Sequence, residues 1–498
     1  MRFHPVPPVS ALLLTGLAAT PIAAQQPALP MAAIDSVVAR LFALDLAPGL
    51  GVVVVRDTQV IFMKGFGFAD LEARRPFTPQ TVFYVASTTK AFTGLAAAML
   101  DRQGTFRLDA PLSRYLPGVR LQSPLDPDSI TIRSLLSHTH GIASGPVSQR
   151  LAYTGEYRGN EELIALLVEH KPLESRAYQY SNIGYNVATL AMDKVTGESW
   201  KTTLERLIFT PLGMKNTSGN VSKFPADRRA MPYRTTPDGF ERLPYGKVDA
   251  NMQSAGGLVT TLEDEARWLE ALLNQGKVDG RQVLPAQAMR EAQTIQARFE
   301  QNVRGIQLFG YALGWNVGHY RADTIYTHGG GFPGFVTHVS FMPGRRIGIV
   351  TMANSGNLGG PLVELVARGI YDALAGLPPP DADSLAVLRA EAQRQRERIK
   401  ADRDRRAARP QTTPLPLSAY AGRYENPAMG SLVLTLNAEG KLEARAGVAS
   451  GPVEVFDGSK HQLRIELFGG GEVLTMEVEG DRVVAAKLGE ARYLRTKD

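Results

Sequence analysis

Short apolar runs occur near both ends of the first 380 residues, and they predict one sheet built from distant parts of the chain. The runs at 51–56 and 59–64, with Arg-Asp-Thr between them, predict an early hairpin. Three later runs joined by Gly and Pro turns predict strands at 324–328, 335–341 and 346–353. The economical arrangement is a single antiparallel sheet to which both ends contribute.

Between these strands the pattern becomes helical, with proline breaks from about 109 to 275. The glycine-rich segment 65–70 is expected to be a loop. The fold class predicted is α+β, an antiparallel sheet flanked by helices with an inserted helical subdomain. The helices are expected at 35–46, 88–103, 130–137, 182–196, 261–275 and 362–375.

The pattern changes again after residue 420, where short strands recur at hairpin spacing. They predict a separate small all-β barrel. The domain boundaries expected are 25–380 for the first domain, 381–416 for a charged helical linker and 417–498 for the β domain. The strands of this β domain are expected at 431–436, 441–446, 462–467, 472–478 and 483–488.

The first 24 residues have the pattern of a secretory signal peptide. Arg2 precedes an apolar run at 11–20, and Ile22-Ala23-Ala24 resembles a cleavage site. The run is too short for a comfortable membrane span, and no later stretch looks like one. We therefore expect an exported protein, periplasmic or extracellular, with no stable membrane span after cleavage. The sequence contains no cysteine, which excludes disulfides and an acylated N-terminal cysteine.

The net charge of +6 raises the question of a polyanionic partner. Segment 389–409 contains nine Lys and Arg residues against four acidic residues, so it carries nearly the whole excess. A solvated, charge-laced helix explains this concentration better than a nucleic-acid surface. We expect no nucleic-acid partner, and the sequence does not indicate an oligomeric state.

Ser87 is the only serine followed three residues later by a lysine, Lys90. Positions three apart share one face of a helix, so the hydroxyl and the amine can meet. A lysine in a poorly solvated pocket loses its proton more easily and can accept that of a serine. This pair predicts a nucleophile activated without histidine.

Two further segments carry candidate chemistry. Tyr180 and Asn182 stand in a loop before a helix, where a phenol can relay a proton and an amide can hold a carbonyl or the lysine. His328 and the glycines after it end a strand, which lets a substrate backbone lie close. The amides of Gly331 and Ser87 are candidates for an oxyanion hole.

The order Ser-x-x-Lys, Tyr-x-Asn and His-x-Gly resembles the serine β-lactamase and penicillin-binding-protein superfamily, most closely its class C-like branch of esterases and D-amino-acid peptidases. The resemblance covers about 32–375 and includes the Ser254-Ala-Gly-Gly-Leu segment; the C-terminal part resembles appended lipocalin-like domains more loosely. It implies that Ser87 is acylated, with Lys90 and Tyr180 as the acid/base pair. Which of the two is the acylation base stays open. Asn182, and by position His328 and Gly330, are the implied substrate-binding residues.

Histidine replaces the lysine that antibiotic-hydrolysing relatives usually have at position 328. A lysine attracts the carboxylate of the antibiotic, whereas histidine is mostly neutral. We therefore expect hydrolysis of small esters, or of amides and peptides with a D-residue. The alternatives are a class C-type β-lactamase and a sensor that is acylated by penicillin without turnover.

His138 and His140 invite comparison with the His-x-His-x-Asp motif of zinc enzymes. Ile142 occupies the place of the aspartate, and no dense cluster of further ligands accompanies the pair. We expect no metal and no cofactor, and assign the two histidines to a structural loop near the cleft. The partner expected is a small-molecule or peptide substrate.

Overall fold

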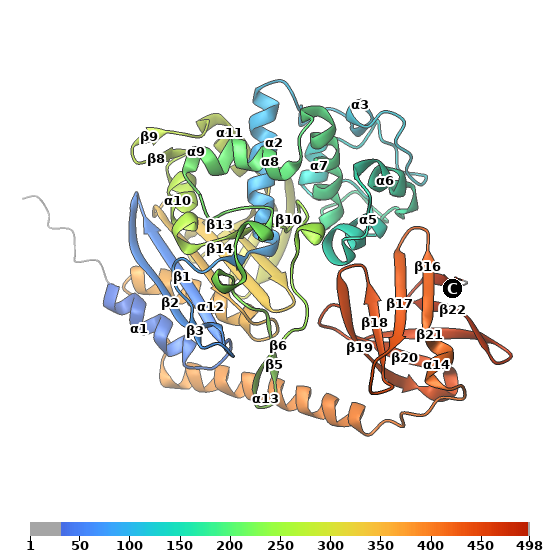
Figure 1. Ribbon diagram of the computed structural model, residues 1–498. Coiled ribbons are helices and arrows are strands. Elements are labelled where there is room, and N and C mark those ends of the chain that lie inside the picture. Colours follow the sequence, from blue (N-terminus) through green and yellow to red (C-terminus); the bar gives the residue numbers. More distant parts are fainter. Residues whose placement is uncertain (1–30, 497–498) are drawn as a thin grey trace, which may run out of the picture.

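The computed structural model describes residues 31–496. A nine-stranded antiparallel sheet forms the centre of the first domain (Figure 1). Strand β1 lies between β15 and β2, with Val53 opposite Val350, so the early hairpin and the late strands form one sheet as predicted. In sheet order the strands are β10 (Ala297–Val303), β11 (Ile306–Tyr311), β12 (Asn316–Tyr320), β13 (Asp323–Phe332), β14 (Phe335–Met342), β15 (Ile347–Ala353), β1 (Gly49–Arg56), β2 (Gln59–Asp70) and β3 (Arg75–Pro76).

The expected loop at 65–70 is wrong, because β2 continues to Asp70. The glycines of this segment allow another part of the backbone to approach the strand closely, and they do not form a turn. A Cβ on Gly65 would lie 1.9 Å from the carbonyl oxygen of Phe77, and Gly67 has φ +63° beside Pro48. The three outer strands β10, β11 and β12 were not predicted.

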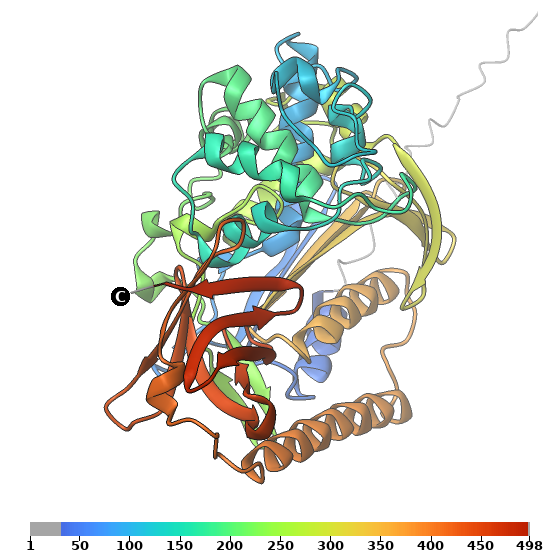
Figure 2. The same cartoon turned by 90° about the vertical axis from the view of Figure 1, so that its right-hand side faces the viewer.

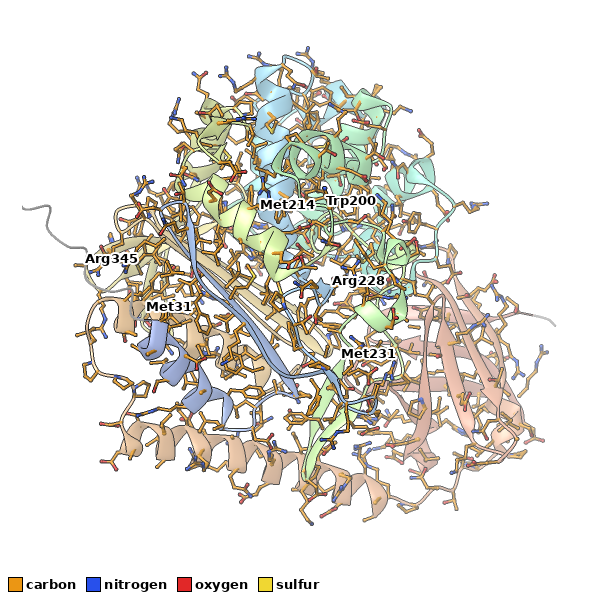
Figure 3. All side chains as sticks on the ribbon, turned by 60° about the vertical axis from the view of Figure 1, so that its left-hand side comes forward. Met31, Trp200, Met214, Arg228, Met231 and Arg345 are labelled. Carbon is orange, nitrogen blue, oxygen red and sulfur yellow. The ribbon has the colours of Figure 1, made fainter. Side chains whose placement is uncertain are left out.

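Helices cover both faces of the sheet, and side chains fill the space between the layers (Figures 1 and 3). One face packs on α1 (Met31–Phe42) and α12 (Gly359–Leu374), and the other packs on α2 (Thr89–Arg102), α10 (Leu262–Leu273) and α11 (Ala286–Gln293). The inserted helical block comprises α3 (Leu112–Tyr115), α4 (Ile132–Leu136), α5 (Pro146–Gln149), α6 (Asn160–Ala165), α7 (Asn182–Thr196), α8 (Trp200–Leu204) and α9 (Thr210–Leu212).

Small strand pairs connect these layers. One of them joins the segment before Ser87 to the segment after Ser254, and so fixes the nucleophile against the helical block. The pairs are β4 (Phe83–Tyr84) with β7 (Val259–Thr260), β5 (Tyr233–Thr236) with β6 (Gly239–Arg242), and β8 (Lys277–Val278) with β9 (Arg281–Gln282).

The charged run forms one helix, α13 (Ala382–Ala407), which passes along the outside of the first domain to the C-terminal part (Figures 1 and 2). That part is a closed eight-stranded barrel, which confirms the predicted small all-β unit. Pairing of Tyr424 with Arg495 closes it. Its elements are α14 (Leu417–Tyr420), β16 (Gly422–Asn426), β17 (Gly430–Leu436), β18 (Leu442–Ala446), β19 (Ala449–Asp457), β20 (Gln462–Ile465), β21 (Glu472–Glu479), β22 (Arg482–Leu488) and β23 (Ala491–Arg495).

Specific contacts tie the barrel to the helical block. The buried Arg150 side chain donates to the carbonyls of Ala428 at 2.7 Å and Pro427 at 2.9 Å. The ring of Phe468 meets that of Tyr153 edge-on, with centroids 4.8 Å apart. The barrel therefore has a defined place beside the first domain.

Between residues 31 and 496, no helix is both long and apolar enough to cross a membrane. The expected signal peptide at 1–24 lies outside the described residues.

Candidate active site

Ser87 lies in a short 3₁₀ turn, Ala86–Thr88, that leads directly into α2. Its side chain is partly exposed, whereas Lys90 in the first turn of α2 is fully buried. The Lys90 Nζ atom lies 3.1 Å from the Ser87 Oγ atom. The spacing of three residues thus brings the amine and the hydroxyl together.

Lys90 has three hydrogen-bond acceptors for its three protons. Besides Ser87, Nζ donates to Asn182 Oδ1 at 2.7 Å and to the carbonyl oxygen of Ala255 at 2.6 Å. Every acceptor is uncharged, and burial lowers the pKa of Lys90 well below its ordinary value. Burial thus favours the neutral amine, which keeps its bonds to Asn182 and Ala255 and presents its lone pair to the Ser87 hydroxyl, whose proton it can accept.

Tyr180 lies over the same amine, with its ring centroid 4.9 Å from Lys90 Nζ. The residue is 43% exposed, so this side of the site is open to solvent. Desolvation of the hydroxyl nevertheless raises its pKa, and a hydrogen bond with Ser87 counteracts part of that rise. The phenol is therefore protonated near neutral pH and is suited to donating a proton.

His138 packs against the loop that contains Tyr180, on the side away from solvent. The sequence did not reveal this contact. Its Nδ1 atom accepts the amide proton of Ser181 at 3.2 Å, and its ring lies 4.6 Å from that of Tyr180. His140 likewise accepts, from the amide of Ile142 at 3.0 Å. Within the described residues no group of three or more potential metal ligands is found.

His328 contributes no positive charge to the site. A carbonyl oxygen can only accept, so the 2.7 Å contact with Gly329 assigns the proton to Nδ1. Nε2 then accepts from the Tyr311 hydroxyl at 3.2 Å. Burial lowers the pKa of His328 to about 3. Both ring nitrogens are engaged by protein groups in a neutral imidazole.

The edge of β13 beside Ser87 is unpaired over its last residues. Strand β12 pairs with β13 only through residues 323–327, while β14 pairs with it as far as Phe332. A two-residue turn joins β13 to β14, so Phe332 and Phe335, which flank the turn, form a hydrogen-bonded pair. The direction of the backbone N–H groups alternates along a strand, so the amide of Gly331 points away from β14. That amide is free to serve an oxyanion hole.

Gly330 makes the close approach of β13 to the nucleophile possible. A Cβ at this position would lie 2.2 Å from the Val85 carbonyl oxygen and 3.2 Å from the Ser87 amide nitrogen. A Cβ on Gly331 would have no neighbour within 4 Å. The glycine run thus has one position that requires glycine for packing and one that does not.

Two cavities adjoin the two ends of this free edge. One of about 260 Å³ is lined by Tyr178, Tyr180, Gly329 and His338 among others. The second, of about 740 Å³, includes Gly331 and Phe332 in its lining. Ser87 itself lines neither cavity; the open space begins at Tyr180 and Gly329 on one side and at Gly331 on the other.

The structure thus brings the side chains of Ser87, Tyr180 and Asn182 to the buried amine of Lys90. It also places Gly330 against the Ser87 amide, while His328 belongs to the wall. Sequence reasoning missed Ala255 as a partner of Lys90, because a main-chain carbonyl has no residue-type signature. The Ser254-Ala-Gly-Gly-Leu segment that contains it was the available signal.

The β-lactamase family model matches residues 37–368 of the chain. The unguisins hydrolase ungD of Aspergillus violaceofuscus is 29% identical over 436 residues, which cover 80% of this chain and 75% of that protein. The octameric penicillin-binding protein homologue from Pyrococcus abyssi superposes with a TM-score of 0.59 at 20% identity, covering 93% of this chain and 99% of that one. The D-amino acid amidase from Ochrobactrum anthropi superposes with a TM-score of 0.58 at 22% identity, covering 69% and 99%. The chain belongs to the β-lactamase family and is a serine hydrolase.

Proposed function

We propose that the protein is an exported serine hydrolase that forms an acyl-enzyme on Ser87. Its substrates in this proposal are small esters, or amides and peptides that contain a D-residue. The observation that carries the proposal is the position of Lys90, buried among three uncharged acceptors of which Ser87 is one. The similarity to an unguisins hydrolase and a D-amino acid amidase supports a substrate of this kind.

In the proposed reaction the Ser87 oxygen attacks the substrate carbonyl while its proton passes to neutral Lys90, either directly or through the Tyr180 hydroxyl, which hands its own proton on to Lys90. The amides of Ser87 and Gly331 stabilise the oxyanion of the tetrahedral intermediate. The protonated Tyr180 or Lys90 then delivers a proton to the leaving group, and the carbon–oxygen or carbon–nitrogen bond breaks. Water attacks the ester on Ser87 in the second half of the reaction and releases the acid.

Ser87→Ala tests this assignment directly. We expect loss of p-nitrophenyl butyrate hydrolysis by at least about a hundredfold, with an unchanged circular dichroism spectrum. Ser113→Ala, at a partly exposed serine bonded to Asp128, is the matched control. Intact mass during turnover of the wild type is expected to show one butyryl group on the peptide containing Ser87. Full activity of Ser87→Ala would overturn the proposal.

β-Lactam hydrolysis is the weaker candidate, because the neutral His328 offers no charge to the antibiotic carboxylate. A chromogenic cephalosporin assay tests it, and turnover near that of the simple ester would favour a β-lactamase. A long-lived mass adduct after penicillin treatment would favour a sensor. Mass analysis of the N-terminus after secretion by a bacterial host tests export, which predicts removal of residues 1–24.

A further inference from the structure

The 740 Å³ cavity lies where three parts of the chain meet. The β5–β6 hairpin and the end of β13 form one side, α13 forms another and the barrel segment around Phe468 forms the third. Figure 1 shows the lower end of the β5–β6 hairpin against α13, with the barrel to its right. This arginine cleft, as we name it, therefore exists only when all three parts are assembled.

Arginines dominate the charged residues of the cleft. Five of them line it together with only three carboxylates. Arg234, Arg406 and Arg464 each make a hydrogen bond or an ion pair with a carboxylate. The five are Arg234, Arg398, Arg403, Arg406 and Arg464, and the carboxylates are Glu241, Asp402 and Glu466.

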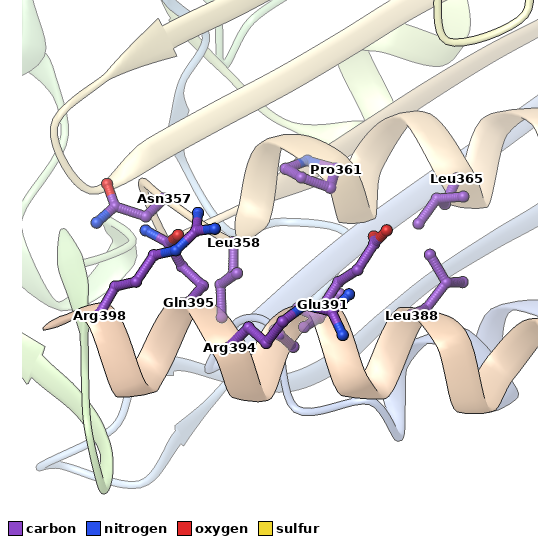
Figure 4. A pocket seen from close by; sticks show the side chains of 11 residues that line it. Asn357, Leu358, Pro361, Leu365, Leu388, Glu391, Arg394, Gln395 and Arg398 are labelled. Atoms are coloured by element: carbon purple, nitrogen blue, oxygen red, sulfur yellow. The ribbon is translucent and has the colours of Figure 1, made fainter. Parts of the chain in front are cut away.

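Two other arginines of α13 form no close ion pair with a carboxylate in the described part of the chain. Among the described residues, Arg398 has neither a hydrogen bond nor an ion pair, and Arg403 has only ion-pair contacts of 3.7 Å to Asp404 and 3.9 Å to Asp238. Figure 4 draws the neighbouring pocket between α12 and α13, which shares Asn357, Gln395 and Arg398 with the cleft, and shows Arg398 and Gln395 extending from α13 toward Asn357. The cleft thus presents two guanidinium groups that lack a close anionic partner.

The cleft wall also contains buried polar atoms with no hydrogen-bond partner. Thr235 is only 3% exposed and its Oγ1 atom has no hydrogen bond, and the buried Nη1 atom of Arg464 has only an ion-pair contact of 3.7 Å with Glu454. Neither atom is accessible from the cleft, so the donors left for an anion are the guanidinium groups of Arg398 and Arg403. A carboxylate supplies two acceptor oxygens and matches a guanidinium group in shape.

The cleft begins at the catalytic strand. Gly331 lines it, and the preceding residue Gly330 lies against the Ser87 amide nitrogen, with its Cβ position 3.2 Å away. A substrate that follows the free edge of β13 beyond Gly331 therefore enters the cleft at Phe332. This route supplies the positive charge that position 328 lacks.

We propose that the arginine cleft binds an anionic group of the substrate, with Arg398 and Arg403 as its principal ligands. The substrates favoured are esters or amides that carry a carboxylate at a distance from the scissile bond. This inference rests on the proposed acyl-enzyme chemistry at Ser87, and it adds a substrate class that no part of that chemistry requires.

Two series of p-nitrophenyl and carboxyphenyl esters test the inference on the full chain. In the first, the acyl group is a succinate, glutarate or adipate monoester, and the neutral reference is the methyl ester of the same acid. In the second, the leaving alcohol is 4-carboxyphenol or its methyl ester. We expect kcat/KM for the acid to exceed that for its neutral partner in one series, and the excess to fall as salt is raised.

Arg398→Gln with Arg403→Gln is the test variant, and Arg389→Gln is the matched control. Arg389 is an exposed arginine of the same helix that does not line the cleft. The ratio of acid to neutral kcat/KM is expected to fall by about tenfold in the double variant, which loses both charge-assisted hydrogen bonds to the carboxylate, and to stay at the wild-type value in the control. Dividing by the neutral ester removes any general loss of activity.

No acid preference in either series, or a preference that the double variant retains, would overturn the inference. Failure of the proposed function is a different result, since Ser87→Ala would then hydrolyse the neutral esters as fast as the wild type. Ser87-dependent hydrolysis of neutral esters without an acid preference would overturn the arginine cleft alone.

Discussion

The Oδ1 atom of Asn182 lies 2.7 Å from the Nζ atom of Lys90 and is one of three acceptors around that buried amine. Asn182 begins α7, whereas Lys90 belongs to α2. Because the asparagine amide is uncharged, it orients the lysine without stabilising its protonated form as a carboxylate would. The identity of this acceptor therefore controls the proton affinity of the proposed base.

Asn182→Asp places a carboxylate at that position and should raise the pKa of Lys90 by about one to three units. If neutral Lys90 accepts the serine proton, the rising limb of kcat/KM against pH moves to higher pH by the same amount. The pH profile of p-nitrophenyl ester hydrolysis measures this shift. Asn437→Asp, in a turn of the barrel, should leave the profile in place, and an unmoved limb in Asn182→Asp would contradict the role of Lys90.

Tyr180→Phe removes the hydroxyl that bonds with Ser87 but keeps the ring over Lys90. We expect kcat for an ester with a poor leaving group to fall by about a hundredfold, since proton donation contributes 10²–10⁴-fold. An activated p-nitrophenyl ester should lose less, because its leaving group needs no proton. Tyr178→Phe, whose ring stacks on Phe299, is the comparison, and equal losses for both esters would argue against proton donation by Tyr180.

Gly330→Ala and Gly331→Ala form a matched pair at neighbouring positions. The added methyl group at 330 would collide with the carbonyl oxygen of Val85, whereas at 331 it meets open space. We expect urea denaturation to show a loss of about 1–3 kcal/mol for Gly330→Ala and less than about 0.5 kcal/mol for Gly331→Ala. Equal stabilities would show that β13 does not press against the Ser87 segment in solution.

Lys247 is a second buried lysine, close to the end of β13. Its Nζ atom donates to the carbonyl of Ala152 at 2.6 Å and lies 3.9 Å from the ring centroid of Phe332. Burial lowers its pKa from 10.5 to about 7. Between these values the unfolded chain holds a proton that the folded chain has lost, so this residue makes folding more favourable as pH rises.

Lys247→Met should therefore change the pH dependence of stability. Relative to the variant, the free energy of unfolding of the wild type is expected to rise from pH 7 to pH 9 by about 1 kcal/mol per pH unit. Urea denaturation at several pH values measures the difference. Lys64→Met, at an exposed lysine paired with Asp35, should show a constant difference over the same range. A constant difference for Lys247→Met as well would contradict the lowered pKa.

The sequence by itself determined the elements whose pattern is local. Period and turn residues were enough for the hairpin before Ser87, for α2 and α7, and for five of the barrel strands, because side-chain spacing within each element decides which face is buried. The same spacing brought the Ser87 hydroxyl to the Lys90 amine, since both lie on one turn of helix.

Only the tertiary structure decided what surrounds that pair. The Ala255 carbonyl, the support of the Tyr180 loop by His138 and the neutral state of His328 depend on contacts between segments far apart in the sequence. The structural role of a glycine is equally hard to predict from sequence. The glycines at 65–70 predict a loop, whereas the segment is part of strand β2. The role depends on which backbone approaches the glycine, and that is fixed only when distant layers pack together.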